Sequence, residues 1–167
     1  PFAMTQWTPQ TRKTEEKCVA PYYYTDSLIN GFRATHWLSG SCTQDYGSFT
    51  VMPVSGSLAL ALKKPESVFT HENEVSSPAH YQVKLDRYNL QVDMTGSARS
   101  GIIQVTALAS DSVYLLINVN SDEAEGDLIL DGDAIIGTNP VHRIYQGWGE
   151  YAGFDGHLFM LTDKKAT

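Results

Sequence analysis

The sequence has no long apolar run and little cysteine. Among its 167 residues no stretch approaches the roughly 20 consecutive apolar residues that cross a bilayer as a helix. No apolar segment resembles a signal peptide, but the chain opens on Pro1 rather than Met, so this says nothing about secretion. Cys18 and Cys42 form no CxxC pair and no cluster with histidine, which argues against zinc. An even number of cysteines permits one disulfide, and the sequence leaves that question open.

Basic residues are scarce and scattered. The chain carries 12 Lys and Arg against 19 Asp and Glu, a formal net charge of −7 and an isoelectric point near 5.1. The only basic doublets are Arg12-Lys13, Lys63-Lys64 and Lys164-Lys165. Nucleic acids and anionic membranes are bound through clustered cations. The composition therefore predicts that neither is a partner.

The usual motifs of an autonomous catalyst are missing as well. Serines, His36 and Asp45 supply the residue types of a Ser-His-Asp triad, but no G-x-S-x-G elbow is present to expose a nucleophile. The G-x-G-x-x-G motif of dinucleotide-binding folds is also absent. A serine hydrolase is therefore not expected.

Four carboxylates lie in predicted strands or loops where glycoside hydrolysis could recruit a pair: Asp45, Glu72, Glu74 and Asp86. That chemistry depends on the distance between the two carboxyl groups, which a sequence does not fix. Most acids of a sandwich are solvated turn residues, and this is the simpler interpretation. His71 stands beside Glu72 in THENEVSSPAHY, but without a second histidine cluster a structural loop is favoured over a metal site.

The sequence does contain clear alternation of apolar and polar residues. HYQVKLDRYNLQVDMTGSA alternates with period 2 on both sides of the polar tetrapeptide DRYN, which predicts a hairpin with one face on a core. GIIQVTAL, SVYLLINVN and GHLFML predict further strands, and the nearly continuous apolar character of SVYLLINVN favours a central position. Asp131-Gly132 in DLILDGDAIIGT indicates a tight turn.

These patterns together predict an all-β fold. At least seven short strands separated by polar or glycine turns indicate one antiparallel β-sandwich domain over residues 1–167. SFTVMPVSGSLALAL belongs to this β-rich pattern, and no segment predicts an amphipathic helix. QGWGEYAGFDG is typical of a loop that presents Trp148 or Tyr151, whose rings would stack on a sugar or, more commonly, pack in a core.

One irregular segment concentrates functional side chains. GFRATHWLSGSCTQDYG, residues 31–47, has neither the period of a strand nor that of a helix. Sugar hydroxyls bind charged partners such as Arg33 and Asp45, and the apolar face of a pyranose packs on an indole such as Trp37. His36 can donate or accept a hydrogen bond near neutral pH. A folded loop with a buried Trp and a satisfied His explains the same composition, so the residues alone leave both interpretations open.

Three blocks in the sequence resemble the N-terminal region of glycoside hydrolase family 92. They are PFAMTQWTP, then PYYYTDSLINGFRATHWLSGSCTQDYGSFTVMPVSG, then FTHENEVSSPAHYQVKLDRYNLQVDMTGSARSGIIQVT. The family pattern runs approximately PFG-M-x-Q-x-SP, GFSHTHLSGTG…DYGDILLMP and F-x-HE-x-E-x-x-x-P-x-YY-x-V-x-L. The blocks cover most of residues 1–106, and GFR…HW-x-SG…TQDYG is similar to a fungal or actinobacterial branch. The chain departs from the pattern at Ala3, where the family has the glycine of PFG, and in RATH, where it has SHTH.

The resemblance implies part of an exo-acting α-mannosidase whose N-terminal β-sandwich packs on an (α/α)₆ barrel. In the family the barrel carries the acid and base carboxylates of an inverting mechanism and a calcium ion, and the sandwich contributes loops to the sugar pocket. Secretion is implied as well. The residues of this chain that match the pocket-side blocks, and are expected to bind an α-mannoside glycan, are Trp7, Arg33, His36, Trp37, Asp45 and Tyr46.

The chain ends at Thr167, so the barrel, with its catalytic carboxylates and calcium ligands, is expected to lie outside it. The isolated chain is then expected to be inactive and to hold no cofactor. It is also expected to need the barrel or another chain to cover its exposed sandwich edges. Two alternatives stay open: a stand-alone carbohydrate-binding sandwich and a purely structural domain.

Overall fold

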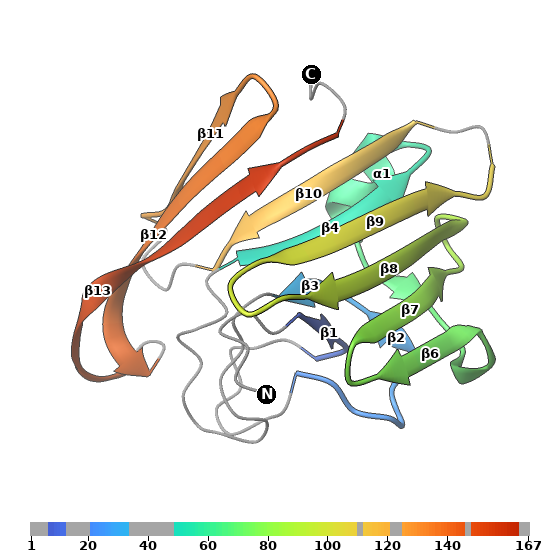
Figure 1. Ribbon diagram of the computed structural model, residues 1–167, viewed down its shortest axis with the longest axis horizontal. Coiled ribbons are helices and arrows are strands. Elements are labelled where there is room, and N and C mark those ends of the chain that lie inside the picture. Colours follow the sequence, from blue (N-terminus) through green and yellow to red (C-terminus); the bar gives the residue numbers. More distant parts are fainter. Residues whose placement is uncertain are drawn as a thin grey trace.

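The computed structural model describes residues 7–12, 21–33, 49–109, 112–120, 125–145 and 148–163 (Figure 1). These residues form strands and two short helical turns, which confirms the predicted all-β fold class. In chain order the elements are β1 (Thr8–Gln10), β2 (Leu28–Ile29), β3 (Gly31–Arg33), β4 (Phe49–Ser55), α1 (Leu58–Lys63), β5 (Ser67–Val68), the 3₁₀ turn η1 (His71–Asn73), β6 (Glu74–Ser77), β7 (His80–Leu85), β8 (Leu90–Gly96), β9 (Gly101–Ala107), β10 (Val113–Val119), β11 (Asp127–Asp131), β12 (Ala134–Tyr145) and β13 (Trp148–Leu161). No helix within the described residues is long and apolar enough to cross a membrane.

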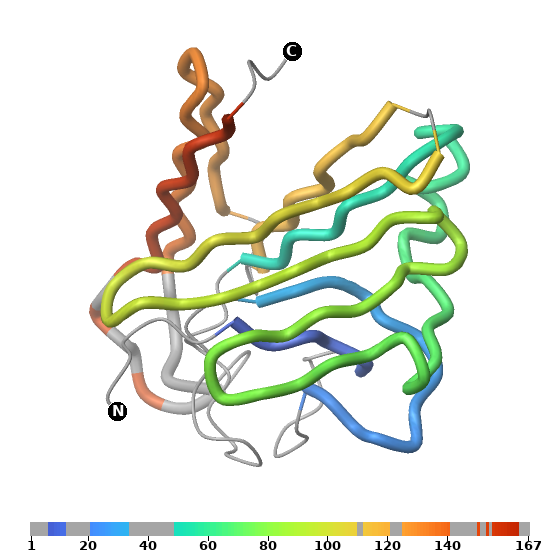
Figure 2. Tube along the Cα trace, turned by 45° about the vertical axis from the view of Figure 1, so that its right-hand side comes forward, coloured from blue at the N-terminus to red at the C-terminus, as the bar shows by residue number. Residues whose placement is uncertain are grey.

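Two four-stranded sheets form the sandwich. One has the strand order β1-β3-β4-β10 and the other β6-β7-β8-β9. The strands β2 and β5 make a small pair, and β11, β12 and β13 make a third sheet that stands at an angle beside the sandwich (Figure 2). All the described pairings are antiparallel, as the hairpin-rich sequence predicts.

The main core lies between the two four-stranded sheets. The alternating apolar residues of β7 and β8 point inward, and none of them is more than 2% exposed: Val83, Leu85, Leu90, Val92 and Met94. From the opposite sheet, β4 contributes Met52 and Val54 to the same cluster. Burial of one such side chain stabilises the fold by about 1.5–3 kcal/mol.

The predicted hairpin turns are present where the sequence places them. The tetrapeptide DRYN joins β7 to β8, and its last residue, Asn89, adopts φ of 47°, a left-handed conformation that asparagine tolerates better than most residues. Gly132, between β11 and β12, has φ of 61°, which glycine adopts without steric cost. Both hairpins are therefore confirmed.

Three local predictions are wrong. SLALAL alternates like a strand, yet Leu58–Lys63 form the helix α1, because Leu, Ala and Lys all favour a helix. The part WGEYAGFDG of the predicted loop QGWGEYAGFDG is not a loop, since residues 148–161 form the single long strand β13. Among the described strands β10 lies at the edge of its sheet rather than in the centre, and its apolar Val113 and Leu115 are 40% and 37% exposed.

Candidate functional site

A row of polar residues crosses one end of the β1-β3-β4-β10 sheet. The strand register pairs Thr8 with Arg33, Arg33 with Thr50, and Thr50 with Asn118. Residues directly opposite one another in a sheet share a face, and Met52, two residues beyond Thr50, points into the core. The inner face of this sheet therefore changes from apolar to polar at the left-hand end of the sandwich in Figure 1.

Arg33 is the charged residue in this row, and only 3% of it is exposed. It ends β3 between Thr8 on one neighbouring strand and Thr50 on the other. A guanidinium sheltered from water makes stronger hydrogen bonds than an exposed one, since the surrounding dielectric constant is lower. The fold thus presents a sheltered cation where the sequence predicts a sugar-binding arginine.

Amide and hydroxyl groups fix the strands around Arg33. The Nδ2 of Asn120 donates to Thr50 Oγ1 at 2.9 Å, and the Nδ2 of Asn118 donates to Asn120 Oδ1 at 2.9 Å. The hydroxyl of Thr50 also lies 3.4 Å from the Oε1 of Gln10, whose side chain is buried. This chain of contacts links β1, β4 and the end of β10, and it holds the polar end of the sheet in one arrangement.

Trp7 comes immediately before β1 and packs its partly buried ring against the core. The ring lies on the backbone of Gly101, where an added Cβ would be 1.7 Å from the indole Nε1, so only glycine fits there. Within the described residues the buried Nε1 has no hydrogen-bond partner. A buried donor that lacks a hydrogen-bond partner costs about 1–3 kcal/mol of stability. A ligand atom that accepted a hydrogen bond from this N–H would remove that cost.

The other four predicted site residues, His36, Trp37, Asp45 and Tyr46, lie outside the described residues, as do Cys18 and Cys42. The described residues on either side of their segment are Arg33, the last residue of β3, and Phe49, the first residue of β4. Since β3 and β4 are neighbours, these two flanking residues lie at the polar end of the sheet.

Sequence patterns did not reveal Gln10, Asn118 and Asn120 as members of this site. The one available signal was Thr50 in FTVMPVS, a polar residue at an alternate position where β4 otherwise carries core residues. The partners of Thr50 are up to 70 residues away in the chain, so only the strand order brings them together.

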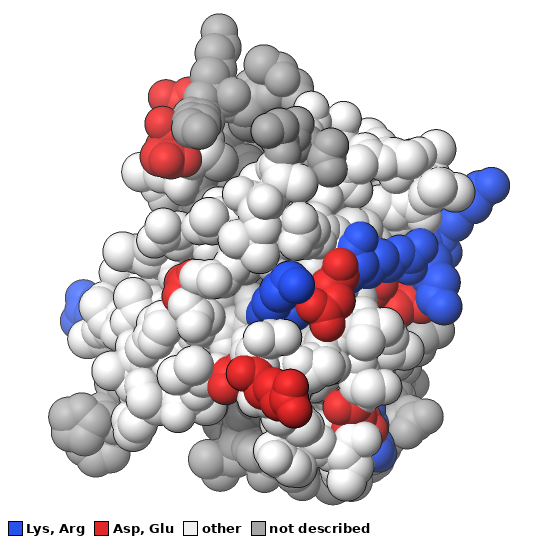
Figure 3. Space-filling model, turned by 90° about the vertical axis from the view of Figure 1, so that its right-hand side faces the viewer, with Lys and Arg blue, Asp and Glu red and all other residues white. Residues whose placement is uncertain are grey.

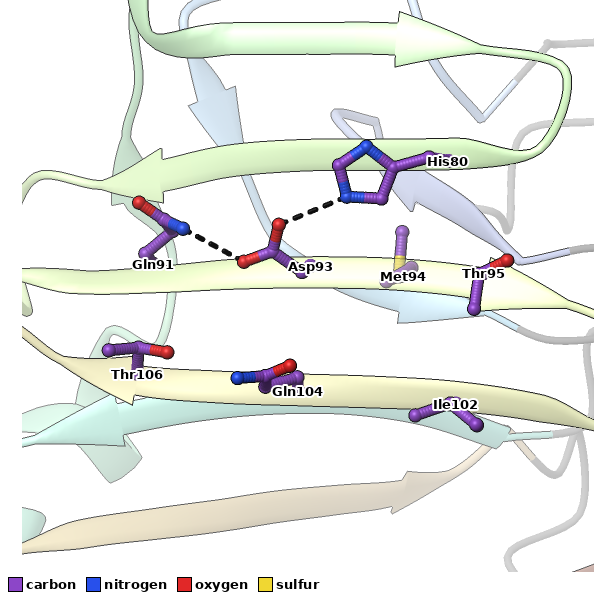
Figure 4. Close-up of a pocket in the computed structure, with 8 residues that line it drawn as sticks. All are labelled: His80, Gln91, Asp93, Met94, Thr95, Ile102, Gln104 and Thr106. Atoms are coloured by element: carbon purple, nitrogen blue, oxygen red, sulfur yellow. Dashed lines mark hydrogen bonds and ion pairs between the residues drawn. The ribbon is translucent and has the colours of Figure 1, made fainter.

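A second polar feature lies on the outer face of β7, β8 and β9. It is a shallow hollow of about 370 Å³, lined by His80, Gln91, Asp93, Met94, Thr95, Ile102, Gln104 and Thr106 (Figure 4). Asp93 sits at its centre and accepts hydrogen bonds from Gln82 at 2.8 Å, Gln91 at 2.9 Å and His80 at 3.0 Å. Burial alone would raise the pKa of Asp93, but these hydrogen bonds outweigh it and hold the pKa below its usual range.

This hollow offers neutral amides and hydroxyls to a ligand, because its carboxylate is already satisfied by three donors. None of the eight residues lining it is Trp, Tyr or Phe, so none provides an indole or phenyl surface for stacking on a sugar ring. The polar end of the β1-β3-β4-β10 sheet is therefore the better candidate for a sugar site.

The side of the molecule away from the polar end mixes both signs of charge. Figure 3 shows basic and acidic side chains next to one another there. Lys64 lies 3.5 Å from Glu66, and Lys84 lies 3.3 Å from Asp86. In these two pairs the opposite charges largely offset one another.

Comparison with known proteins gives a consistent family. The model of the glycosyl hydrolase family 92 N-terminal domain matches residues 1–167. The family GH92 alpha-mannosidase BT3965 from Bacteroides thetaiotaomicron has a TM-score of 0.77 and 26% sequence identity over 99% of this chain, and it has also been solved in complex with mannoimidazole. The family GH92 inverting mannosidase BT2199 from Bacteroides thetaiotaomicron VPI-5482 has a TM-score of 0.73 and 26% identity over 95% of this chain. No curated protein matched.

The chain spans less than a quarter of these solved relatives, 23% of the first and 20% of the second. The family model nevertheless matches every residue from Pro1 to Thr167, and the fold agrees over nearly the same span. The chain therefore belongs to glycosyl hydrolase family 92, as an N-terminal domain of that family.

Proposed function

We propose that the chain forms the N-terminal sandwich of an exo-acting α-mannosidase and supplies one side of its sugar pocket. The polar end of the β1-β3-β4-β10 sheet supports this proposal most directly. It combines the buried Arg33, the unmet N–H of Trp7 and the two residues that flank residues 34–48. The two solved relatives described above are mannosidases, and one of them was also solved in complex with mannoimidazole.

In this proposal the chain binds and orients the terminal mannose but does not cleave the bond. Arg33 and Asp45 hold ring hydroxyls through charge-assisted hydrogen bonds, and Trp37 packs against the apolar face of the pyranose. His36 and Tyr46 add hydrogen bonds, as Trp7 does through its indole N–H. An inverting reaction with its acid and base carboxylates is assigned to the part of the enzyme beyond this chain.

A calcium ion, which the family resemblance implies, is assigned to that other part as well. Within the described residues no group of three or more His, Cys, Asp or Glu side chains is arranged to hold a metal ion. The binding role proposed here does not depend on calcium.

The proposal also includes the setting of the domain. Its expected partners are α-mannoside glycans and a catalytic barrel that packs on the sandwich, and the enzyme is expected to be secreted. The GFR…HW…TQDYG variant supports a place in a fungal or actinobacterial branch of the family.

Two single substitutions in the full-length enzyme test the pocket role. His36→Ala and Asp45→Ala should each lower kcat/KM on an α-mannoside by roughly ten- to a hundredfold, since each removes a hydrogen bond to a charged or polar group. Asp93→Asn, in the hollow on the outer face of β8, serves as the matched control and should leave kcat/KM unchanged. Unchanged activity in both pocket variants would sink the proposal.

The polar hollow of β7–β9 favours a second candidate, a carbohydrate-binding sandwich that acts without a barrel. Calorimetry of the chain with mannobiose separates the two. Binding at millimolar affinity or better, lost in Gln104→Ala, would support the binding module. Absence of binding would instead support a half-site that needs its partner domain.

A further inference from the structure

The segment 21–27 connects the two sides of the domain just before the candidate site. It leads through β2 into β3 and so into Arg33. One of its sides contacts the residues that follow β1, and the other contacts η1, β6 and β7. Each of the two contacts includes a titratable side chain, Asp26 on the first side and His71 on the second. Asp26 makes its contacts when it has lost a proton, whereas His71 makes its contacts when it has gained one.

The first anchor is Asp26. Its carboxylate accepts two hydrogen bonds from Arg12, from Nε to Oδ2 at 2.8 Å and from Nη2 to Oδ1 at 3.0 Å. The hydroxyl of Thr11 donates to the same Oδ2 at 2.8 Å and accepts from the backbone N–H of Tyr23 at 2.9 Å. The Arg12 guanidinium also lies 3.6 Å above the centre of the Tyr23 ring. The three hydrogen bonds that Asp26 accepts are made by its ionised form.

The second anchor is His71, which contacts Glu74, the first residue of β6. The side chain of Glu74 is 8% exposed. Its carboxylate accepts hydrogen bonds from the phenol of Tyr22 at 2.9 Å, the phenol of Tyr81 at 2.6 Å and Nδ1 of His71 at 2.5 Å. The other ring nitrogen of His71, Nε2, lies 2.6 Å from the backbone carbonyl of Tyr24, and the Tyr24 and His71 rings stack 3.9 Å apart. His71 thus joins the segment to the buried carboxylate.

The geometry fixes the protonation of His71. A backbone carbonyl can only accept, so Nε2 must carry a proton. The carboxylate of Glu74 facing Nδ1 has no proton to donate, so Nδ1 must carry a proton too. Both contacts exist together only when the imidazole is doubly protonated and positive.

We infer that the segment 21–27 is docked by two anchors of opposite titration, Asp26 and His71, so that the strand leading to Arg33 is held firmly only within a window of pH. The link to the sugar pocket rests on the proposed function, whereas the docking itself does not. Above the window His71 loses a proton and one of its two contacts fails. Below the window Asp26 gains a proton and loses its ion pair with Arg12.

The limits of the window follow from the direction of each shift. The hydrogen bonds to Glu74 and to the Tyr24 carbonyl raise the pKa of His71, so its stabilisation is complete below about 6.5, the unfolded value, and is lost as the pH rises through the folded one. The Arg12 and Thr11 hydrogen bonds lower the pKa of Asp26, so its stabilisation is complete above about 3.9 and is lost as the pH falls further. Full docking therefore spans about pH 4 to 6.5.

The two phenols that share the carboxylate of Glu74 keep one charge state throughout this window. Burial and the contact with Glu74 raise the pKa values of Tyr22 and Tyr81 far above their usual range, so both stay neutral donors. Phe69 meets the His71 ring edge-on and carries no charge. Glu72, on the same 3₁₀ turn as His71, is exposed.

Amide hydrogen exchange in the intact gene product tests the inference without substrate. The reporters are the backbone amides of Tyr23, Asp26 and Phe69, which hydrogen-bond to Thr11, Tyr23 and Ser27. Protection factors, which remove the intrinsic pH dependence of exchange, should fall about threefold or more between pH 6 and pH 9 in the wild type. His71→Gln should show lower protection at pH 6 and no further fall.

His80→Gln is the matched control, because His80 also pairs with a carboxylate, Asp93, but through one ring nitrogen only. It should retain the wild-type profile. A wild-type profile in His71→Gln, or an equal change in both variants, would overturn the inference.

A second measurement needs no variant. The NMR titration of the His71 ring in the wild type should share its midpoint with the loss of protection at Tyr23 and Asp26, and separate midpoints would also overturn the inference. A failure of the mannosidase proposal would leave all these profiles unchanged, so the two failures can be told apart.

Discussion

The β6-β7-β8-β9 sheet and the β11-β12-β13 sheet are built from similar alternating sequences but differ in what covers them. On β8 the apolar residues Leu90, Val92 and Met94 are at most 2% exposed. In the third sheet a cross-strand row of Ile129, Ile136 and Phe159 is 59%, 37% and 67% exposed. Alternation thus determines that a segment forms a sheet, but the protein surface packed against it determines whether that sheet acquires a core.

An exposed apolar row of this kind is an interaction surface or an aggregation hazard. Because the chain spans less than a quarter of its solved relatives, we expect the remainder of a family 92 enzyme to cover the row. The difference between the two sheets can be tested by matched substitutions, one in the covered β6-β7-β8-β9 sheet and one in the exposed β11-β12-β13 sheet.

The largest difference is expected from core truncation. Leu90→Ala removes a side chain that is 1% exposed, so it should lower the free energy of unfolding by about 2–5 kcal/mol. Ile129→Ala in the third sheet should change it by no more than about 0.5 kcal/mol, since little burial is lost. Urea unfolding of both variants of the isolated chain is the measurement. Equal losses would show that the third sheet is covered in solution.

A smaller difference is expected between two carboxylates that each accept hydrogen bonds from three side chains. The side chain of Glu74 is 8% exposed, whereas that of Asp93 on the outer face is 20% exposed. Glu74→Gln should lower the free energy of unfolding by about 1–3 kcal/mol, because the phenols of Tyr22 and Tyr81 lose their charged acceptor. Asp93→Asn should cost less than about 1 kcal/mol, as water replaces the lost contacts. Thermal unfolding ranks them, and the reverse order would contradict the role of burial.

The sequence was sufficient for those parts of the fold that depend on near neighbours. The β7–β8 hairpin follows from period 2 and from DRYN, and the β11–β12 turn follows from Asp131-Gly132. It was not sufficient for α1, where alternation of Leu and Ala resembles a strand, although the helix buries Ala61 and exposes Leu60. The sequence also did not reveal that β10 lies at the edge of its sheet. A strand carries apolar residues on both faces wherever other layers lie near both of them, and this holds for edge strands as well as for central ones.

The candidate site likewise contains some residues that the sequence predicts and others that it does not. Trp7 and Arg33 were predicted from residue type and family pattern. The fold places the buried Arg33 on β3 and Trp7 immediately before the neighbouring strand β1. Asn118 and Asn120 could not be predicted, because their roles depend on the pairing of β4 with β10. The protonation state of His71 could not be predicted from the sequence either. It depends on the backbone carbonyl of Tyr24, which lies 47 residues away in the chain.

The exposed row of the third sheet gives a prediction about association rather than folding. Phe159→Ser should leave the stability of the isolated chain within about 0.5 kcal/mol, since the ring is 67% exposed. It should nevertheless reduce self-association, which light scattering over a range of concentrations detects. In the full-length enzyme the same change should lower the unfolding temperature, because there the row is expected to be covered. Unaltered association of the isolated chain would show that the row is harmless without a partner.

The smallest expected effect is electrostatic and compares Asp26, in its ion pair, with Asp131, exposed at the end of β11. Hydrogen bonds from Arg12 and Thr11 lower the folded pKa of Asp26, so the wild type gains stability from this group at pH 7 and loses it as the pH falls through that pKa. Asp26→Asn should therefore be less stable than the wild type at pH 7 by less than about 1 kcal/mol, because the pair is partly solvated. The gap should shrink toward pH 3, while Asp131→Asn should show no gap at either pH. A gap that widened on acidification would mean that Asp26 is stabilised in its protonated form, and the acid-side anchor of segment 21–27 would have to be abandoned.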